Sequence, residues 1–258
     1  MFGLESTIPN DRFARWIRTL EARHLAELSF PEVSRGLRAL SSAYVERRSR
    51  LARGAALDGA GKRAAFALFY GPLHYLIVRE IVREIPSATS HVAAIVDLGC
   101  GTGAAGAAWA AASAGAPRVL GIDRHPWAVD EAARTYRVFG LAGRTLQADV
   151  ATASLPRGPA SVVAAFTLNE LEAPQRDALV PRLMDRASRG DRLLIVEPVA
   201  SSAAPWWRRW REAFVAAGGR ADEWRVRTEL PEIVEKLDRA AGLDHGELTA
   251  RSLWLAGS

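Results

Sequence analysis

The sequence has 258 residues, of which 49% are hydrophobic and 24% charged, and this balance excludes disorder as a description of the whole chain. Its single cysteine, Cys100, excludes an internal disulfide framework and any cysteine-based metal site. The net charge of +5 permits contact with nucleic acid without requiring it. The N-terminus has no basic region followed by an apolar stretch, and no window reaches about 18 strongly apolar residues, so we expect no signal peptide and no membrane span. With one cysteine and no secretory start, we expect a cytoplasmic protein without a metal site.

Residues 1–90 are predicted to form a helical N-terminal extension. Apolar residues recur at three- and four-residue spacing over 13–28 and again over 33–44, which places each set on one helical face. A longer apolar segment, 62–85, contains Pro72, whose missing amide should kink or split the helix. We expect this extension to cap a pocket.

Residues 91–258 are predicted to form an α/β domain with a doubly wound, mostly parallel sheet. Short β-branched runs alternate there with helical windows, which indicates parallel strands joined by helices. We expect strands at 93–98, 119–123, 145–148, 161–167, 193–197 and 248–255, and helices at 104–114, 126–139, 174–188 and 231–241.

A glycine-rich turn follows the first of these strands. Glycines there permit positive φ and let a ligand approach bare backbone, and the next helix offers its free amides. The spacing of Gly101, Gly103 and Gly106 also fits a dinucleotide site. The loop could thus bind either a dinucleotide or S-adenosylmethionine. Asp97 favours S-adenosylmethionine, because a carboxylate under the loop would repel the pyrophosphate of a dinucleotide but attract the ammonium group of S-adenosylmethionine.

The run from Asp97 to Gly103 resembles motif I of the class I S-adenosylmethionine-dependent methyltransferases. The resemblance implies a seven-stranded, Rossmann-like sheet, S-adenosyl-L-methionine as cofactor and S-adenosyl-L-homocysteine as product. Asp123 ends the next strand 20 residues after Gly103, the spacing of a carboxylate that accepts both ribose hydroxyls. Asp149 matches the position whose side chain often reaches the adenine amino group. The predicted cofactor-binding residues are Asp97, Gly99, Cys100, Gly101, Gly103, Asp123, Arg124, Asp149, Val150 and Phe166.

Candidates for the methyl acceptor site follow the fourth strand. Asn169 could hydrogen-bond an acceptor, and Glu170 could act as a base, orient an amine or cap a helix. Tyr70 and His74 flank the break at Pro72, in the region that folds over the cofactor in many members of the family. The end of the fourth strand lacks the Asn/Asp-Pro-Pro-aromatic signature of nucleic acid amino-methyltransferases, which argues against that class. From their positions, we predict Asn169, Glu170, Tyr70 and His74 as the catalytic residues.

The segment 199–228 is predicted to be a lid or substrate-covering insertion. Its tryptophans and arginines could stack on bases and pair with phosphates. At helical spacing, however, Trp206, Trp210 and Phe214 share one stripe. We favour an amphipathic helix with tryptophan inward and arginine outward.

A narrower resemblance links the chain to the methyltransferase branch associated with the mitochondrial small ribosomal subunit. It is carried by 166–171, 195–198 and parts of the tail after Leu230. That branch has a cysteine cluster, which this sequence lacks, so its metal cluster is excluded here. We expect a small-molecule acceptor and a monomer or weak homodimer. The alternatives are ribosomal RNA or ribosomal protein as acceptor, or a non-catalytic ribosome-assembly factor that retains the cofactor fold.

Overall fold

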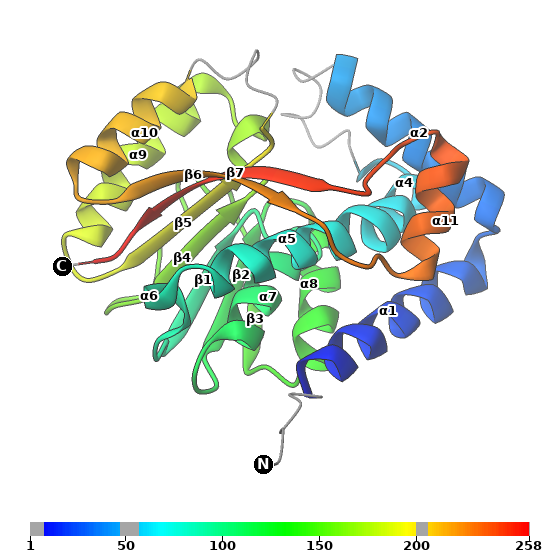
Figure 1. The fold of residues 1–258 in the computed structure, drawn as a ribbon, viewed down its shortest axis with the longest axis horizontal. Coiled ribbons are helices and arrows are strands. Elements are labelled where there is room, and N and C mark those ends of the chain that lie inside the picture. The colour runs from blue at the N-terminus through cyan, green and yellow to red at the C-terminus, as the bar shows by residue number, and fades with distance from the viewer. Residues whose placement is uncertain (1–7, 47–56, 200–205, 258) are drawn as a thin grey trace.

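A computed structural model describes residues 8–46, 57–199 and 206–257. Its centre is a seven-stranded sheet in the order β3-β2-β1-β4-β5-β7-β6, with helices on both faces (Figure 1). The strands are β1 (Ala94–Leu98), β2 (Arg118–Asp123), β3 (Gly143–Gln147), β4 (Ser161–Ala165), β5 (Arg192–Glu197), β6 (Arg220–Val226) and β7 (Leu248–Leu255). The predicted fold class is confirmed.

The order in which strands are added to the sheet reverses between β1 and β4: β1 to β3 extend to one side, and the strands from β4 onward lie on the other. β1 pairs in parallel with β2 on one side and with β4 on the other, and β2 and β4 continue outward to β3 and β5. Only β7 breaks the parallel pattern, pairing antiparallel with both β5 and β6. In open α/β sheets, ligands bind outside the carboxyl ends of the strands at such a switch point. This geometry directs attention to the loops that follow β1 and β4.

Alternate residues of the sheet enter two separate hydrophobic clusters, as the two-residue period of a strand requires. In β1, Ile95 packs with the helices α5 (Gly71–Arg83), α7 (Ala104–Ala112) and α8 (Pro126–Val138). Val96 and Leu98 pack with α9 (Ala173–Ala187) and α10 (Trp206–Ala216) on the opposite face. Both faces of the central strands are therefore buried.

The described part of the segment predicted as a lid belongs to these core layers. Trp210 and Phe214 of α10 are buried on the sheet, and exposed arginines cover the other side of the helix. The amphipathic interpretation of α10 is thus confirmed. The next stretch is β6, an edge strand that the sequence analysis did not predict. The lid prediction therefore does not fit residues 206–226, because these pack in and against the sheet; residues 200–205 lie outside the described residues.

The N-terminal region is helical, as predicted. Its elements are α1 (Ile8–Glu27), α2 (Phe30–Glu46), α4 (Ala60–Ala65), the π-helical turn η2 (Phe66–Tyr70), α5 (Gly71–Arg83) and α6 (Pro86–Thr89). The kink predicted at Pro72 takes the form of η2: the helix widens by one π turn just before the proline and continues. A π turn inside an α-helix often marks a functional site.

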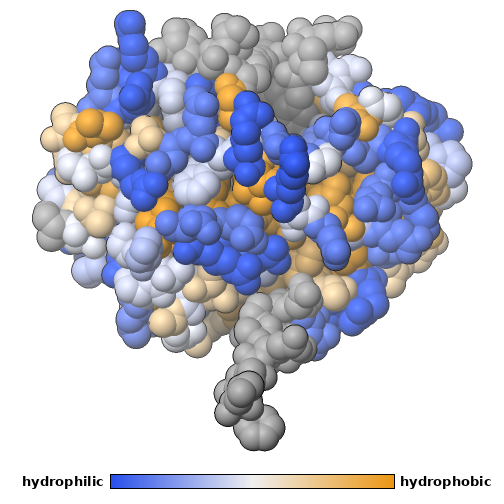
Figure 2. All heavy atoms as spheres, viewed as in Figure 1, coloured by the Kyte–Doolittle hydropathy of each residue, from blue (hydrophilic) through white to orange (hydrophobic). Residues whose placement is uncertain are grey.

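The helix from Ala60 to Arg83 is long and apolar enough to cross a membrane by length and composition, and 72% of its apolar window is buried inside the protein. Such burial is typical of a core helix. On the face that Figure 2 shows, hydrophobic patches lie among polar side chains.

The N-terminal helices share a hydrophobic cluster with the sheet domain. Phe13 and Trp16 of α1 belong to the same buried cluster as Tyr136 of α8. The Trp16 indole donates to the Thr135 hydroxyl at 3.0 Å. In Figure 1, α1 and α2 lie beside α11 (Glu232–Ala241), which comes from the far end of the chain. The N-terminal helices are therefore packed onto the sheet domain, and their role as a cap over a pocket stays a prediction.

Candidate functional site

The glycine loop after β1 is shaped by three glycines with positive φ. Gly99, Gly101 and Gly103 have φ of 67°, 50° and 75°, values that residues other than glycine rarely adopt. The amides of Gly99 and Cys100 donate to the carbonyl of Ile122 at 2.8 and 3.0 Å, which ties the loop to β2. The loop thus presents bare backbone at the start of α7, as predicted.

Asp97 lies beneath this loop and supports it. Its carboxylate is 1% exposed, and Oδ2 accepts the Gly106 amide at 2.8 Å and the Tyr136 hydroxyl at 3.3 Å. Burial raises the pKa of Asp97 to about 7, although the hydrogen bonds from Gly106 and Tyr136 oppose the shift. The predicted attraction of a ligand ammonium by Asp97 stays a prediction, because the bonds in this structure are internal.

Asp123 joins the loop to the end of β2. Its Oδ2 accepts the Gly101 amide at 3.0 Å, and its Oδ1 accepts the His125 amide at 2.8 Å. The carboxylate is partly exposed, so lone pairs remain for ligand hydroxyls. Cys100 is buried, and burial raises the pKa of its thiol well above the usual value. Its side chain packs against Gly121 of β2, so only its backbone could meet a cofactor, and that predicted contact stays a prediction.

The predicted residues after β3 differ in position. Asp149 is partly exposed, but its oxygens already accept the Ala151 amide at 2.8 Å and the Gln175 side chain at 2.9 Å. Val150 is buried in the hydrophobic cluster beneath α9, so its side chain is part of the core. Arg124 is exposed, one residue beyond Asp123. Contacts of Asp149 and Arg124 with a cofactor stay predictions, and only the backbone of Val150 could meet one.

The turn after β4, residues 166–170, lies against the glycine loop. The Thr167 hydroxyl lies 3.1 Å from the Leu98 carbonyl and 3.3 Å from that of Gly99. A Cβ added at Gly99 would stand 2.3 Å from the Thr167 methyl group, so only glycine fits there. Phe166 has φ of 57° and is the one non-glycine residue in the described part of the chain with positive φ. Such strain persists where surrounding contacts impose it, commonly at functional sites.

The same turn is held from β5 by a buried carboxylate. Glu197 is fully buried at the end of β5; its Oε1 accepts the Leu168 amide at 2.7 Å, and its Oε2 accepts the side-chain amide of Asn169. Burial raises the pKa of Glu197 to about 8; the nearby Glu170 carboxylate adds to the shift, and the Leu168 amide and Arg251 oppose it. Asn169 and Glu170 are partly exposed, so both predicted residues are accessible at this turn.

Five aromatic rings gather over the glycine loop. Phe66 lies so close that a Cβ added at Gly101 would meet its ring at 3.2 Å. Around Phe66 stand Tyr70, His74 and Trp127, with centroids 6.0, 6.2 and 6.3 Å away. His74 also stacks on Phe166 at 4.0 Å. Helix residues before β1, Trp127 in the first turn of α8 and Phe166 in the turn after β4 therefore form one aromatic cluster at the switch point.

The two predicted catalytic rings in this cluster are poor proton acceptors near neutral pH. Burial lowers the pKa of His74 to about 3 and raises the pKa of Tyr70 to about 12, with a hydrogen bond to Ser41 opposing the latter. His74 is consequently neutral and Tyr70 protonated. Both fit a wall of the site better than the role of a base.

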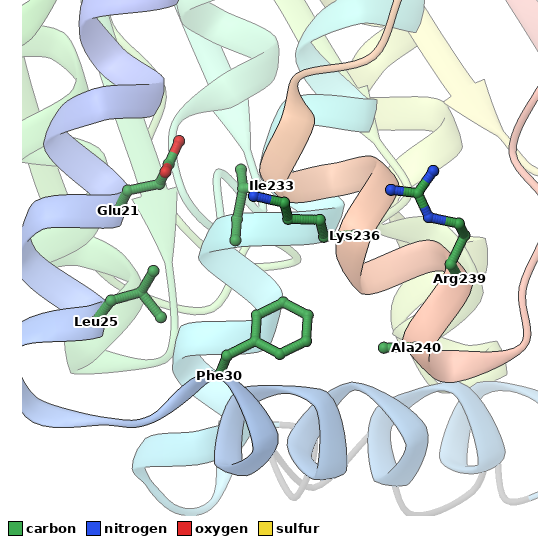
Figure 3. A pocket seen from close by; sticks show the side chains of 7 residues that line it. All are labelled: Glu21, Leu25, Phe30, Ile233, Lys236, Arg239 and Ala240. Atoms are coloured by element: carbon green, nitrogen blue, oxygen red, sulfur yellow. The ribbon is translucent and has the colours of Figure 1, made fainter.

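A hollow of about 620 Å³ opens elsewhere, between α1, α2 and α11 (Figure 3). Leu25, Phe30 and Ile233 line it with apolar surface, and Lys236 and Arg239 bring cationic groups to it. It contains none of the predicted site residues. We therefore assign the functional site to the loops at the switch point.

The sequence analysis missed several residues of the site. Glu197 ends an apolar strand, as Asp123 does, and Asp97 is the last residue but one of β1, so this signal was present in the sequence. Phe66 and Thr167 gave no comparable signal, because only the folded chain brings them to the glycine loop. Among the described residues, no group of three or more His, Cys, Asp or Glu could hold a metal ion.

The glycine cradle, the carboxylates and the aromatic cluster fit S-adenosylmethionine. Bare backbone accommodates its methionine end, and Asp123 has accepting lone pairs for ribose hydroxyls. The electron-rich faces of Phe66, Trp127 and Phe166 suit a sulfonium or an adenine ring. The fold and site thus define a Rossmann-like, S-adenosylmethionine-binding class.

Comparisons with known proteins agree. Residues 95–190 match a family model described as a methyltransferase domain. The N-methyltransferase NodS from Bradyrhizobium japonicum, solved with S-adenosyl-L-homocysteine, is 17% identical with a TM-score of 0.52, over 82% of this chain and 98% of that chain. A Listeria monocytogenes protein assigned to the class I methyltransferases is 12% identical with a TM-score of 0.51, over 96% and 88%. No match to a curated protein was found.

Residues 95–190 thus carry a methyltransferase domain, and the sheet has the Rossmann-like fold of the class I S-adenosylmethionine-dependent methyltransferases, which supports S-adenosylmethionine as the cofactor. At these identities the solved structures establish the fold alone. The narrower resemblance to the branch associated with the small ribosomal subunit is not supported by these matches and stays a prediction.

Proposed function

We propose that this methyltransferase acts on a small molecule, held between the glycine loop and the N-terminal helices. The observation that carries the proposal is the aromatic cluster of Phe66, Tyr70, His74, Trp127 and Phe166 over Gly101. Partly buried rings from both sides of a site enclose a compact apolar ligand and exclude water from it.

The residues of the site have separable roles in this proposal. Gly99, Gly101 and Gly103 give the cofactor room, and Asp123 accepts its ribose hydroxyls. The cofactor, when bound, supplies a methyl group carried on a sulfonium. An N–H or O–H acceptor gives its lone pair to that methyl carbon, the carbon–sulfur electron pair stays on sulfur, and the acceptor's proton passes to water or to Glu170.

One observation favours RNA as a second candidate acceptor. Arg208, Arg209 and Arg211 are exposed on α10, and arginines on one helix face can contact phosphates. Arg209 lies 3.6 Å from Asp177 and Arg208 lies 3.8 Å from Glu212, so acidic neighbours reduce this positive charge. The aromatic cluster is therefore the stronger argument.

The test is to incubate the protein with methyl-labelled S-adenosylmethionine and a host extract separated into ribosomal, free-RNA, protein and small-metabolite fractions. Asp123→Ala is the site variant. Asp222→Ala is the matched control, because Asp222 is also hydrogen-bonded but lies on the edge strand β6. We expect label in the small-metabolite fraction from the wild type and from Asp222→Ala, with a large loss for Asp123→Ala.

Label in the ribosomal, RNA or protein fraction would overturn the small-molecule proposal and identify the acceptor class. Cofactor binding by calorimetry without transfer to any fraction would favour the non-catalytic assembly factor.

A further inference from the structure

The Asn169 side chain is hydrogen-bonded to Glu197, a carboxylate that the proposed function does not yet use. Its Nδ2 donates to Oε2 of Glu197, which is fully buried. An ionised carboxylate only accepts hydrogen bonds, so it requires the amide nitrogen, and not the amide oxygen, on its side. Within the described residues, Oδ1 of Asn169 accepts no hydrogen bond.

The turn that carries Asn169 is fixed at three points. Thr167 lies against the carbonyls of Leu98 and Gly99, the Leu168 amide donates to Glu197, and Arg176 donates to the Leu168 carbonyl at 3.2 Å. Asn169 therefore cannot easily move away from Glu197. Because Nδ2 of Asn169 is bonded to Glu197, the remaining polar atom of the side chain is Oδ1, a hydrogen-bond acceptor near the carboxyl end of β4.

We propose that Glu197 is a positioning residue that orients the Asn169 amide so that its Oδ1 accepts a hydrogen bond from the molecule to be methylated. This inference rests on the proposed function and narrows its substrate class to acceptors whose reacting atom bears a hydrogen, namely an amine or a hydroxyl. The N–H or O–H points to Oδ1, which turns the lone pair of the reacting atom toward the methyl group. Asn169 takes no proton, because an amide is not a base.

Charged groups face Glu197 from three elements. Glu170 lies in the same turn, Arg251 comes from β7 and Arg176 from α9. The Leu168 amide and Arg251 lower the pKa of Glu197, but burial outweighs them, so the carboxylate is in its accepting, ionised form above a pH of about 8. Experiments at pH 9 keep Glu197 above its pKa of about 8.

Two variants separate a role of Glu197 in orienting Asn169 from a role in supporting the turn alone. Glu197→Gln keeps an oxygen for the Leu168 amide but places an NH₂ group opposite Asn169. The Asn169 amide must then rotate, which restores a hydrogen bond but turns its own NH₂ toward the acceptor. Asn169→Asp in the Glu197→Gln background returns an oxygen to both ends. A role in support alone predicts that Glu197→Gln behaves like the wild type, whereas orientation predicts a loss that the double variant reverses.

The matched control is Asp191→Asn. Asp191 is also a buried carboxylate that accepts a backbone amide, from Ala160 at 2.8 Å, but it precedes the opposite end of β5. It lies outside the site, so its replacement should leave transfer per folded molecule unchanged.

The first readout needs no acceptor. In ¹⁵N-labelled protein at pH 9, the side-chain amide protons of Asn169, assigned by their absence in Asn169→Asp, should be shifted downfield by the carboxylate. This shift should disappear in Glu197→Gln and persist in Asp191→Asn. An unshifted Asn169 amide in the wild type would overturn the proposed orientation.

The second readout is methyl transfer to the small-metabolite fraction of the host extract. We expect kcat/KM to fall about 30-fold in Glu197→Gln, with unchanged S-adenosylhomocysteine affinity, and to return to within about threefold of the wild type in the double variant. Equal transfer by the wild type and Glu197→Gln would overturn the inference alone. Wild-type protein that binds the cofactor but labels nothing would instead overturn the proposed function, and with it any acceptor for Asn169.

Discussion

Two buried glutamates show how differently two regions of this protein use a charge. Glu131 of α8 is 1% exposed at the contact with α1, where both its oxygens meet the Arg23 guanidinium and His24 lies 3.7 Å away. Burial alone would raise its pKa, but His24 and Arg23 lower it below its usual value. Glu197 is fully buried at the end of β5, and its pKa is raised to about 8.

The opposite pKa shifts distinguish Glu131, whose charge stabilises the fold, from Glu197, whose charge is unfavourable for folding. A lowered carboxylate pKa means that folding favours the ionised form, whereas a raised pKa means that folding opposes it. Structural ion pairs belong to the first kind, and strongly raised pKa values cluster at functional sites. The α1–α8 interface thus attaches the N-terminal helices to the sheet domain, whereas the raised pKa of Glu197 agrees with the proposed acceptor site beside it.

The largest expected effect is on stability and comes from Glu131→Gln. It leaves an NH₂ group facing Arg23 and removes a buried ion pair, so we expect a loss of about 2–3 kcal/mol in the free energy of unfolding. Chemical denaturation at pH 7 measures this loss.

Glu80→Gln is the control, because Glu80 also pairs with two arginines, Arg79 and Arg83, but is more exposed. It should cost at most about 1 kcal/mol. The stabilisation by Glu131 is present above the unfolded pKa of 4.5 and is lost as the pH falls below it. Equal losses for Glu131→Gln and Glu80→Gln would remove the structural half of the comparison.

Glu197→Gln should change stability with the opposite dependence on pH. Between the unfolded pKa of 4.5 and the folded pKa of about 8, the unfolded chain releases a proton that the folded chain keeps. The stability of the wild type relative to Glu197→Gln should therefore fall with rising pH in this window, by at most about 1.4 kcal/mol per pH unit, and level off above it. Denaturation curves of both proteins at pH 5, 6.5, 8 and 9 measure the difference. If the difference in the free energy of unfolding between the two proteins did not change with pH, this would contradict a raised pKa of Glu197.

The smallest expected effect distinguishes the aromatic cluster from the cap. Phe66 and Phe30 are both partly buried phenylalanines of the N-terminal region, but Phe66 lies over Gly101 and Phe30 lines the hollow in Figure 3. Phe66→Ala should raise the KM for the acceptor about fivefold, because one wall of the site is removed.

Phe30→Ala is the matched variant and should leave this KM unchanged while costing similar stability, about 1–3 kcal/mol. Initial transfer rates and thermal unfolding of both variants provide the comparison. A rise in KM for Phe30→Ala, or none for Phe66→Ala, would place the acceptor outside the aromatic cluster.

The same division explains what the sequence could predict. The cofactor side is local in sequence: the glycines, Asp97 and Asp123 stand at fixed spacing, and their function depends mainly on backbone conformation. The sheet followed from the alternation of strands and helices, except for β6, whose polar edge residues gave little strand signal.

The acceptor side could not be predicted in the same way, because tertiary packing assembles it. Phe66 comes from a π turn before the sheet, and Trp127 follows β2. Thr167 follows β4, and Glu197 ends β5. Their proximity depends on how the N-terminal helices dock on α8 and on the switch point between β1 and β4. His74 was predicted as a catalytic candidate from its position, but its burial, which no spacing rule reveals, leaves it neutral.

The most direct test of the account is a calorimetric titration of S-adenosylhomocysteine into the wild type, Gly101→Val and Gly140→Val. Both glycines have positive φ, 50° at Gly101 and 68° at Gly140, so both variants carry similar backbone strain. An added Cβ meets the Phe66 ring at Gly101 but meets nothing within 4 Å at Gly140. We predict that affinity falls about 100-fold in Gly101→Val, equivalent to about 2.7 kcal/mol, and is unchanged in Gly140→Val. Equal affinities in all three proteins would contradict a cofactor site on the glycine loop.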